Sequence, residues 1–384
     1  MTEIYIVRHA EAEGNIYRRA HGHYDGYITQ NGYCQIEALR HRFSNIPVDV
    51  VYMSDLFRTR ATAEAIYGGR GIPHIATPAL REINLGEWED LTWGELPRRY
   101  PEQYDAWTFH PHDFRVPGSE THEQVYRRFK AELDRIVREN PGRTVAIVSH
   151  GAAIRDLLCG LTFGDFTRLC DIGWCDNTAV AKLEADERLN YRVVYQNDNS
   201  HLAELSTLGK QKWWRQEDDQ MLYNLWFRRA QLPEDLPALR DAYERAWTEI
   251  FRRADYRAAG TNAHIRALAR SCAGAIAFGM QKQRAAGVIM LDADERIVPE
   301  GGHISMLFLE PEFRNRGFGV QFLGYAASVY RALGRKLLTI RVAEHNAHAR
   351  TFYQKYGFEE LGREEDSGAR QILMKKAIYF TYPD

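Results

Sequence analysis

The sequence predicts an α/β protein of two domains. Its 384 residues exceed the usual length of a single domain. Strand-like and helical runs alternate over residues 1–207, which favours helices that cross over a mainly parallel sheet in three layers. Residues 208–220 are polar, lack a hydrophobic period and indicate a linker. Residues 221–384 then predict a second domain with a mixed α/β fold.

In the first domain, short apolar runs predict buried strands at residues 4–7, 50–53 and 144–148. Helical periodicity predicts helices over residues 31–44 and 57–67, and a long one after Pro117-Gly118 with Ser119 as its N-cap. That long helix carries an apolar face and ends at Pro141-Gly142. The residues of the face are Val125, Phe129, Leu133, Ile136 and Val137.

In the second domain, the same patterns predict four strands and four helices. The strands are expected at residues 222–227, 287–291, 303–309 and 336–342. The helices are expected at residues 234–251, at 263–280, from Val320 onward, and at 346–358.

The composition excludes several classes of protein. Fifty Lys and Arg residues against 52 Asp and Glu give a net charge of -2, without the basic excess of nucleic-acid or anionic-membrane binders. Trp213 and Trp214 in the linker are more typical of aromatic side chains packed on a domain than of a nucleic-acid site. No apolar run is long enough for a membrane helix, and residues 1–7 predict a strand rather than a signal peptide. Five cysteines without a C-x-x-C pair favour a reducing cytoplasm.

The sharpest chemical feature is a pair of histidines that each follow a buried strand. His9 follows the first strand and His150 follows the strand at 144–148. Ligands of parallel α/β sheets bind at the carboxyl ends of the strands, where both histidines are expected to lie. Arg8 adjoins His9, and Arg58 lies at the start of a helix; guanidinium groups bind phosphate oxygens in pairs. These residues predict a pocket for a phosphoryl group.

Ordered motifs around these residues resemble the histidine phosphatase superfamily, the phosphoglycerate-mutase-like fold. The resemblance covers about the first 200 residues and departs from the family at Ala10, where glycine is usual. The motif residues are Arg8-His9, Glu11, Asn15, Gly22, Asp25, Thr29, Gly32, Gln35, Ser54 to Arg58, Leu80 to Glu82, Gly86 to Glu89, Pro117 to Glu120 and Ser149 to Gly151.

The resemblance implies that His9 attacks phosphorus and forms a phosphohistidine, which water then hydrolyses. It implies phosphate ligands at Arg8, Asn15, Arg58, His150 and Gly151, and a proton-donating role for Glu82. His150 would also stabilise charge during the reaction. No metal is expected, and His21-x-His23 and His110-x-His112 lack the partners of a metal site.

The stretch between Glu82 and Pro117 is short, as in small broad-specificity and α-ribazole-type phosphatases, whereas mutases carry longer insertions. A phosphatase is therefore expected rather than a mutase. Three tryptophans in or beside this stretch either line an apolar substrate pocket or belong to the core, and the sequence leaves both readings open. They are Trp88, Trp93 and Trp107.

A strand, a glycine-containing loop and a helix succeed one another around Gly317-x-Gly319. Glycines let backbone amides approach an anion, which a helix N-terminus also favours. With Arg314 before the loop and Asn346, Ala349, Phe352, Tyr353 and Gly357-Phe358 downstream, the pattern resembles the GNAT family of acetyl-CoA-dependent N-acetyltransferases. The resemblance covers about residues 221–378 and is loose before residue 280.

The resemblance implies acetyl-CoA as the acyl donor, with Tyr353 protonating the departing thiolate. Tyr353 as a plain core aromatic is the alternative. The general base is left open among Glu310, Glu344, His303 and a water relay. The residues implied to hold the cofactor are Leu307, Phe308, Leu309, Arg314, Asn315, Arg316, Gly317, Phe318, Gly319, Val320 and Asn346.

The leading hypothesis is a bifunctional enzyme that acts on a small-molecule phosphomonoester and an amine, with no nucleic acid or membrane as partner. Fusion suggests that both reactions belong to one pathway. A second hypothesis makes the GNAT domain a non-catalytic acetyl-CoA sensor that regulates the phosphatase. A third, an inactive phospholigand-binding module, is disfavoured because the reactive residues are all retained. The sequence names neither substrate nor the oligomeric state.

Overall fold

A computed structural model describes residues 1–210, 222–251, 260–366 and 369–379. They form two compact units, each with its own sheet. The predicted α/β class is confirmed for both. The predicted linker lies outside the described residues from residue 211 on, as do Trp213 and Trp214, whereas Thr207–Lys210 form the short helix α8.

The first unit is built on a six-stranded sheet of order β3-β2-β4-β1-β5-β6. The pairs β2·β3, β2·β4 and β1·β4 are parallel, and β5 and β6 continue the sheet antiparallel. The strands are β1 (Thr2–Arg8), β2 (Val50–Ser54), β3 (His74–Thr77), β4 (Thr144–Ser149), β5 (Val180–Ala185) and β6 (Tyr191–Asp198). The helices besides α8 are α1 (Glu13–Tyr17), α2 (Gln30–Phe43), α3 (Phe57–Tyr67), α4 (Leu96–Arg99), α5 (Pro101–Phe109), α6 (His122–Glu139) and α7 (Gly151–Thr162).

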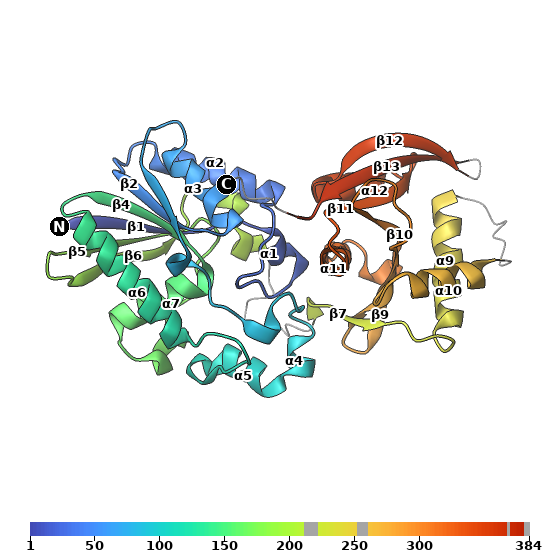
Figure 1. Cartoon of the computed structure of the whole chain (residues 1–384), viewed down its shortest axis with the longest axis horizontal. Coiled ribbons are helices and arrows are strands. Elements are labelled where there is room, and N and C mark those ends of the chain that lie inside the picture. The colour runs from blue at the N-terminus through green and yellow to red at the C-terminus, as the bar shows by residue number, and fades with distance from the viewer. Residues whose placement is uncertain (211–221, 252–259, 367–368, 380–384) are drawn as a thin grey trace. The chain divides into compact units, whose positions relative to one another are not determined.

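Helices cover both faces of this sheet (Figure 1). The helices α2 and α3 pack on the face that carries Val7, Val51 and Val148, and all of these side chains are buried. The amphipathic α6 and the apolar α7 lie on the opposite side, with α7 beginning directly after β4. Strand residues alternate between the faces, so both sides are apolar, as a sandwiched parallel sheet requires.

The second unit has a seven-stranded sheet of order β12-β13-β11-β10-β9-β8-β7, in which only β10·β11 is parallel among the described pairs. The helices α9 and α10 cover one face through an apolar cluster. The strands are β7 (Trp226–Arg229), β8 (Ile276–Gln281), β9 (Arg284–Asp292), β10 (Gly301–Leu309), β11 (Leu337–Ala343), β12 (Glu359–Asp366) and β13 (Ala369–Ala377). The helices are α9 (Leu236–Phe251), α10 (Thr261–Ser271), α11 (Gly319–Ala332) and α12 (Ala347–Lys355).

Three sequence-based assignments were wrong. The N-cap of α6 is Thr121, not Ser119, because Thr121 and Gln124 form a reciprocal capping box. The helix predicted over 263–280 ends at Ser271, and β8 follows it after Gly274, whose φ of 86° is left-handed. The strand predicted at 222–227 is β7, which begins at Trp226. Small apolar residues before Met280 mimic a helical period although they lie in a buried strand.

The capping box predicts a measurable stability difference. Thr121→Ala should lower the free energy of unfolding by about 1 kcal/mol, because it leaves the amide of Gln124 without its acceptor. Thr121→Ser keeps the hydroxyl and should cost little. Urea unfolding of the full chain, monitored by a signal from the first unit, measures the free energy of unfolding of both variants. An equal loss for the two variants would contradict the assigned cap.

Candidate active sites

The parallel register of β1 and β4 brings the two strand-end histidines together. Arg8 pairs with Ser149, so His9 and His150 leave the same edge of the sheet side by side. Their ring centroids lie 5.3 Å apart, and His9 and His150 are 1% and 0% exposed. A third histidine, His21, lies edge-on to His9 with its ring centroid 6.0 Å away.

Hydrogen bonds fix the tautomers of both strand-end histidines. Nδ1 of His9 contacts the carbonyl oxygen of Ala10 at 2.7 Å, and a carbonyl only accepts, so Nδ1 carries the proton. The lone pair of neutral His9 is therefore on Nε2. Arg58 Nε donates to Nδ1 of His150 at 3.2 Å, so neutral His150 carries its proton on Nε2, which is buried without a partner. The pair thus presents one nucleophilic nitrogen and one N–H donor.

Burial and neighbouring cations keep these histidines neutral. Burial is the largest cause that holds the pKa of His9 well below its ordinary value, followed by the charges of Arg58 and Arg8. Burial and then Arg58 likewise lower the pKa of His150. The pKa of His21 falls to about 3 for the same two reasons. A neutral imidazole is the form that attacks an electrophile.

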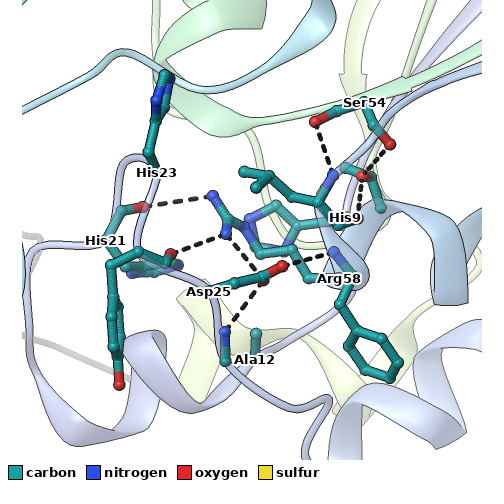
Figure 2. A network of polar contacts seen from close by, with 12 residues as sticks. His9, Ala12, His21, His23, Asp25, Ser54 and Arg58 are labelled. Atoms are coloured by element: carbon teal, nitrogen blue, oxygen red, sulfur yellow. Dashed lines mark hydrogen bonds and ion pairs between the residues drawn. The ribbon is translucent and has the colours of Figure 1, made fainter. Parts of the chain in front are cut away.

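Arg58 is fully buried, and the protein itself satisfies its guanidinium (Figure 2). Besides the bond to His150, Nη1 donates to the carbonyl of Tyr24 and to Asp25 Oδ1, both at 3.1 Å. Nη2 donates to the carbonyls of His21 and Gly22 at 3.4 and 2.7 Å. All five N–H bonds therefore have acceptors, and Arg58 acts on the site through its charge and through His150.

Arg8, in contrast, has a side-chain N–H donor without a partner among the described residues. Its Nη1 donates to the carbonyl of Cys175 at 2.6 Å, whereas its buried Nε has no partner among the described residues. A Cβ on Gly151 would lie only 3.2 Å from this Nε, so glycine lets Arg8 lie against the start of α7. Arg8 Nε and His150 Nε2 are therefore two buried donors without a partner among the described residues, and buried donors require an acceptor.

Glu82 lies across the N-terminus of α7. Its carboxylate accepts the amides of Ala152 and Ala153 at 3.1 and 2.8 Å and that of Ile83 at 3.0 Å. A helix N-terminus favours such a negative group. Asn15 accepts the amide of Ala12 through Oδ1 at 2.9 Å, which leaves its Nδ2 as the available donor.

The structure assigns one of the three tryptophans to the core. Trp88 is 0% exposed and packs edge-on against Phe114 at 5.0 Å, so it belongs to the core. Trp107 contacts the same phenylalanine but is only partly buried, as is Trp93. Among the described residues no cluster of His, Cys, Asp and Glu fits a metal ion.

Sequence reasoning missed the place of His21 in this site. Its pairing with His23 directed attention to metal ligands, although its position beside a glycine of the motif was a usable signal. Asp25, in contrast, was quoted only as a motif residue, and the structure shows that it forms an ion pair with Arg58 at 3.1 Å.

In the second unit, β10 and β11 diverge in the middle of the sheet. They pair from Gly301↔Leu337 to Ile304↔Ile340, although β10 continues to Leu309 and β11 to Ala343. A bulge after Ile304 marks the point of divergence. Amides of alternate residues point to opposite edges of a strand, and Glu310 N–H bonds toward β9. The amides of Leu307 and Leu309 therefore face the gap.

The loop before α11 places several backbone amides at the start of that helix. Among the described residues, the amides of residues 316–320 donate no backbone hydrogen bond outside the helices and strands. Asn315 and Gly317 have φ of 58° and 80°, which curls the backbone so that successive N–H groups converge. Arg314 supports the loop through a 2.9 Å bond to the carbonyl of Leu309. This arrangement fits a pyrophosphate such as that of CoA.

Helix α12 meets this loop. A Cβ on Gly319 would lie 3.0 Å from the ring of Phe352, so the two motifs of the second unit are in contact. Tyr353 is 6% exposed, and burial raises its pKa, which keeps the hydroxyl protonated. Asn346 caps α12 by accepting the amide of Ala349 at 3.0 Å.

The three candidate bases of the second unit all have partners. Glu310 binds Arg245 through both oxygens at 3.1 and 2.7 Å, and Glu344 binds Arg363 at 3.0 Å. His303 lies in the paired part of β10, and its Nε2 accepts Nη1 of Arg341 at 3.2 Å. Burial is the main cause that lowers its pKa to about 4.

The neutral histidines predict a loss of stability in acid. A histidine with a lowered pKa stays neutral in the folded state, whereas the unfolded chain binds a proton as the pH falls through 6.5. The free energy of unfolding is then unaffected by these histidines above pH 6.5. Below that pH it decreases by roughly 1.4 kcal/mol per pH unit for each such histidine. Urea unfolding between pH 7.5 and 5.5 should show a shallower slope for His21→Gln than for wild type, and parallel slopes would contradict the assigned neutral state.

Comparison with known protein families gives one match in each half of the chain. A family model described as the histidine phosphatase superfamily (branch 1) matches residues 4–199, and one described as an acetyltransferase (GNAT) domain matches residues 266–378. Among the described residues no helix is both long and apolar enough to cross a bilayer.

Individual relatives match the first half. Phosphoserine phosphatase 1 of Hydrogenobacter thermophilus is 31% identical over 204 residues, 53% of this chain and 96% of that protein. Phosphoglycerate mutase-like protein 4 of Arabidopsis thaliana is 34% identical over 158 residues, 40% of this chain and 69% of its own length. The solved structure of Bacillus stearothermophilus YhfR is 30% identical, with a TM-score of 0.51, and covers 53% of this chain and 100% of its own. The chain belongs to branch 1 of the histidine phosphatase superfamily and carries a GNAT acetyltransferase domain in its second half.

Proposed function

We propose that the chain is a bifunctional enzyme that hydrolyses a phosphomonoester through a phosphohistidine and transfers an acetyl group from acetyl-CoA to an amine. The observation that carries the first activity is the free Nε2 lone pair of a neutral, buried His9 beside two orphaned donors, Arg8 Nε and His150 Nε2. A nucleophile, an anion pocket and a carboxyl group together make phosphoryl transfer the reaction that this site supports best.

In the proposed first step, His9 Nε2 forms a bond to phosphorus while the bond to the leaving oxygen breaks. Arg8 and His150 donate to the phosphoryl oxygens, and the positive charge of Arg58 stabilises them from behind. The carboxyl group of Glu82 must enter this step protonated, and it then gives that proton to the leaving oxygen. In the second step a water molecule attacks phosphorus, Glu82 takes its proton, the bond to His9 breaks and inorganic phosphate leaves.

In the second unit, the amides of residues 316–320 would hold the pyrophosphate of CoA, and those of Leu307 and Leu309 would hold the pantetheine arm. When bound, acetyl-CoA supplies an activated acyl group on a thiol leaving group. As the nitrogen of the substrate amine forms a bond to the acetyl carbon, the carbon–sulfur bond would break, Tyr353 would give its proton to the sulfur, and the amine would lose a proton to water. The buried hydroxyl of Tyr353 is protonated at neutral pH.

O-Phosphoserine is the first substrate to test, because a relative that is 31% identical is named a phosphoserine phosphatase. It carries a phosphomonoester and an amine, so one compound reports on both sites. Wild type should release phosphate from it, and the amino acid left behind is a candidate acetyl acceptor.

His9→Gln should abolish phosphate release, because glutamine keeps a polar side chain but has no nucleophilic nitrogen. Phosphate assay against wild type measures this. Acetyl-CoA binding by calorimetry should be unchanged, and urea unfolding of the first unit, compared with wild type, shows whether the variant is folded. Turnover retained by His9→Gln would remove His9 as the nucleophile.

Tyr353→Phe should slow acetyl transfer by about tenfold or more, since a positioned general acid contributes on the order of 10²–10⁴-fold. Free thiol release from acetyl-CoA in the presence of amines measures the rate, and calorimetry should show nearly wild-type CoA binding. If wild type binds acetyl-CoA, alters its phosphatase rate and releases no thiol with any amine, the second domain is a sensor instead.

A further inference from the structure

We infer that residues 205–208, here called the clasp, position the nucleophile of the phosphatase; this rests on the proposed role of His9. The clasp consists of Leu205, Ser206, Thr207 and Leu208. It is distant in sequence from His9 and does not belong to the motifs that identified the family. Two hydrogen-bonded paths lead from it to the backbone on either side of His9.

The first path runs through Gln35. Thr207 Oγ1 accepts from Gln35 Nε2 at 2.9 Å and donates to Glu11 Oε2 at 2.9 Å. Gln35 Nε2 also donates to the carbonyl of Leu205 at 2.8 Å. Its Oε1 in turn accepts the backbone amide of Glu11 at 2.8 Å, two residues after His9. The clasp thus orients the side chain of Gln35, which binds the backbone just after His9.

The second path runs through Asp176. This buried carboxylate accepts the amides of Thr207 and Leu208, both at 3.1 Å, and the hydroxyl of Ser206. It also accepts the amide of Asn177 at 2.8 Å. Asn177 Nδ2 donates to the carbonyl of His9 itself at 2.9 Å. The clasp therefore holds Asp176, which in turn positions Asn177, the residue that binds the backbone carbonyl of His9.

The same loop supports Arg8. The amide of Thr178 donates to the carbonyl of Arg8 at 3.1 Å, and the carbonyl of Cys175 accepts Arg8 Nη1 at 2.6 Å. A shift of this loop would move the nucleophile and the proposed phosphate ligand together. Positions in an active site tolerate little displacement, because a shift of about 1 Å costs up to roughly 100-fold in rate.

The clasp supplies hydrogen-bond donors to two buried carboxylates. Asp176 and Glu11 are 0% and 5% exposed, and neither forms an ion pair with a cation in the part of the chain that the structure describes. Their charges depend on amide and hydroxyl donors, and three of the five donors to Asp176 come from the clasp. A buried carboxylate that loses donors must recruit water or rearrange. Either change disturbs Asn177.

Thr207→Val in the full chain tests the clasp, because valine keeps the shape and the backbone amide but removes Oγ1. With p-nitrophenyl phosphate we expect kcat to fall about tenfold while KM changes less than about twofold, since the nucleophile is misdirected more than the phosphate pocket is lost. Thr207→Ser should restore the rate. Thr167→Val, at an exposed threonine of the same unit, is the matched control and should leave kcat unchanged.

Single-turnover formation of phosphohistidine, measured well below the melting temperature, separates positioning from folding. A variant that is only less stable forms phosphohistidine at the wild-type rate per folded molecule, and that result would overturn the clasp while leaving the phosphatase intact. A wild-type chain without phosphatase activity overturns the proposed function and the clasp with it. If Thr207→Val does not fold, Ser206→Ala removes one donor to Asp176 and should show the same fall in kcat at constant KM.

Discussion

The first site depends on one backbone constraint, the parallel register of β1 and β4. Because Arg8 pairs with Ser149, the residues that follow both strands emerge at the same edge, and the amide of His9 bonds to the carbonyl of Ser149 at 2.9 Å. A slip of one residue would turn the side chains of one strand to the opposite face. The apolar faces of the two strands exclude such a slip, so core packing holds the two histidines in place.

Burial then determines what these histidines can do. A buried imidazole beside two arginines loses its proton, and each hydrogen bond to Nδ1 decides what Nε2 presents. His9 donates through Nδ1 and keeps a lone pair, whereas His150 accepts through Nδ1 and keeps a proton. The two residues are alike in sequence context, yet their hydrogen-bond partners give them opposite roles. The cost of burying Arg58 beside them is offset by its five acceptors, including Asp25.

The sequence predicted the parts of the fold that hydrophobic period and turn residues control. Helix α3 was predicted with its observed bounds, and the buried strands β1, β2 and β4 were found to within two residues. The boundary at residue 271 was not predictable, because Ile276 to Met280 alternate with small residues that suit a helix or a strand equally, and only pairing with β7 and β9 decides between them. Thr121 escaped notice because Ser119 offered an equivalent hydroxyl nearer the turn.

The two sites also differ in how much of them a sequence can reveal. The first is built from side chains that follow strands, so His9, His150 and Arg8 could be placed together before the structure was known. The saturation of Arg58 could not, because its acceptors are mostly backbone carbonyls that any residue supplies. The proposed CoA site consists largely of backbone donors, and in the sequence it is marked by the glycines of its loop and by the motif residues on either side of them. The clasp also acts through backbone groups. Asp176 accepts backbone amides, and because nearly every residue has one, the sequence does not show which amides it binds. Residues that position a site through backbone contacts thus emerge only when the chain is seen folded.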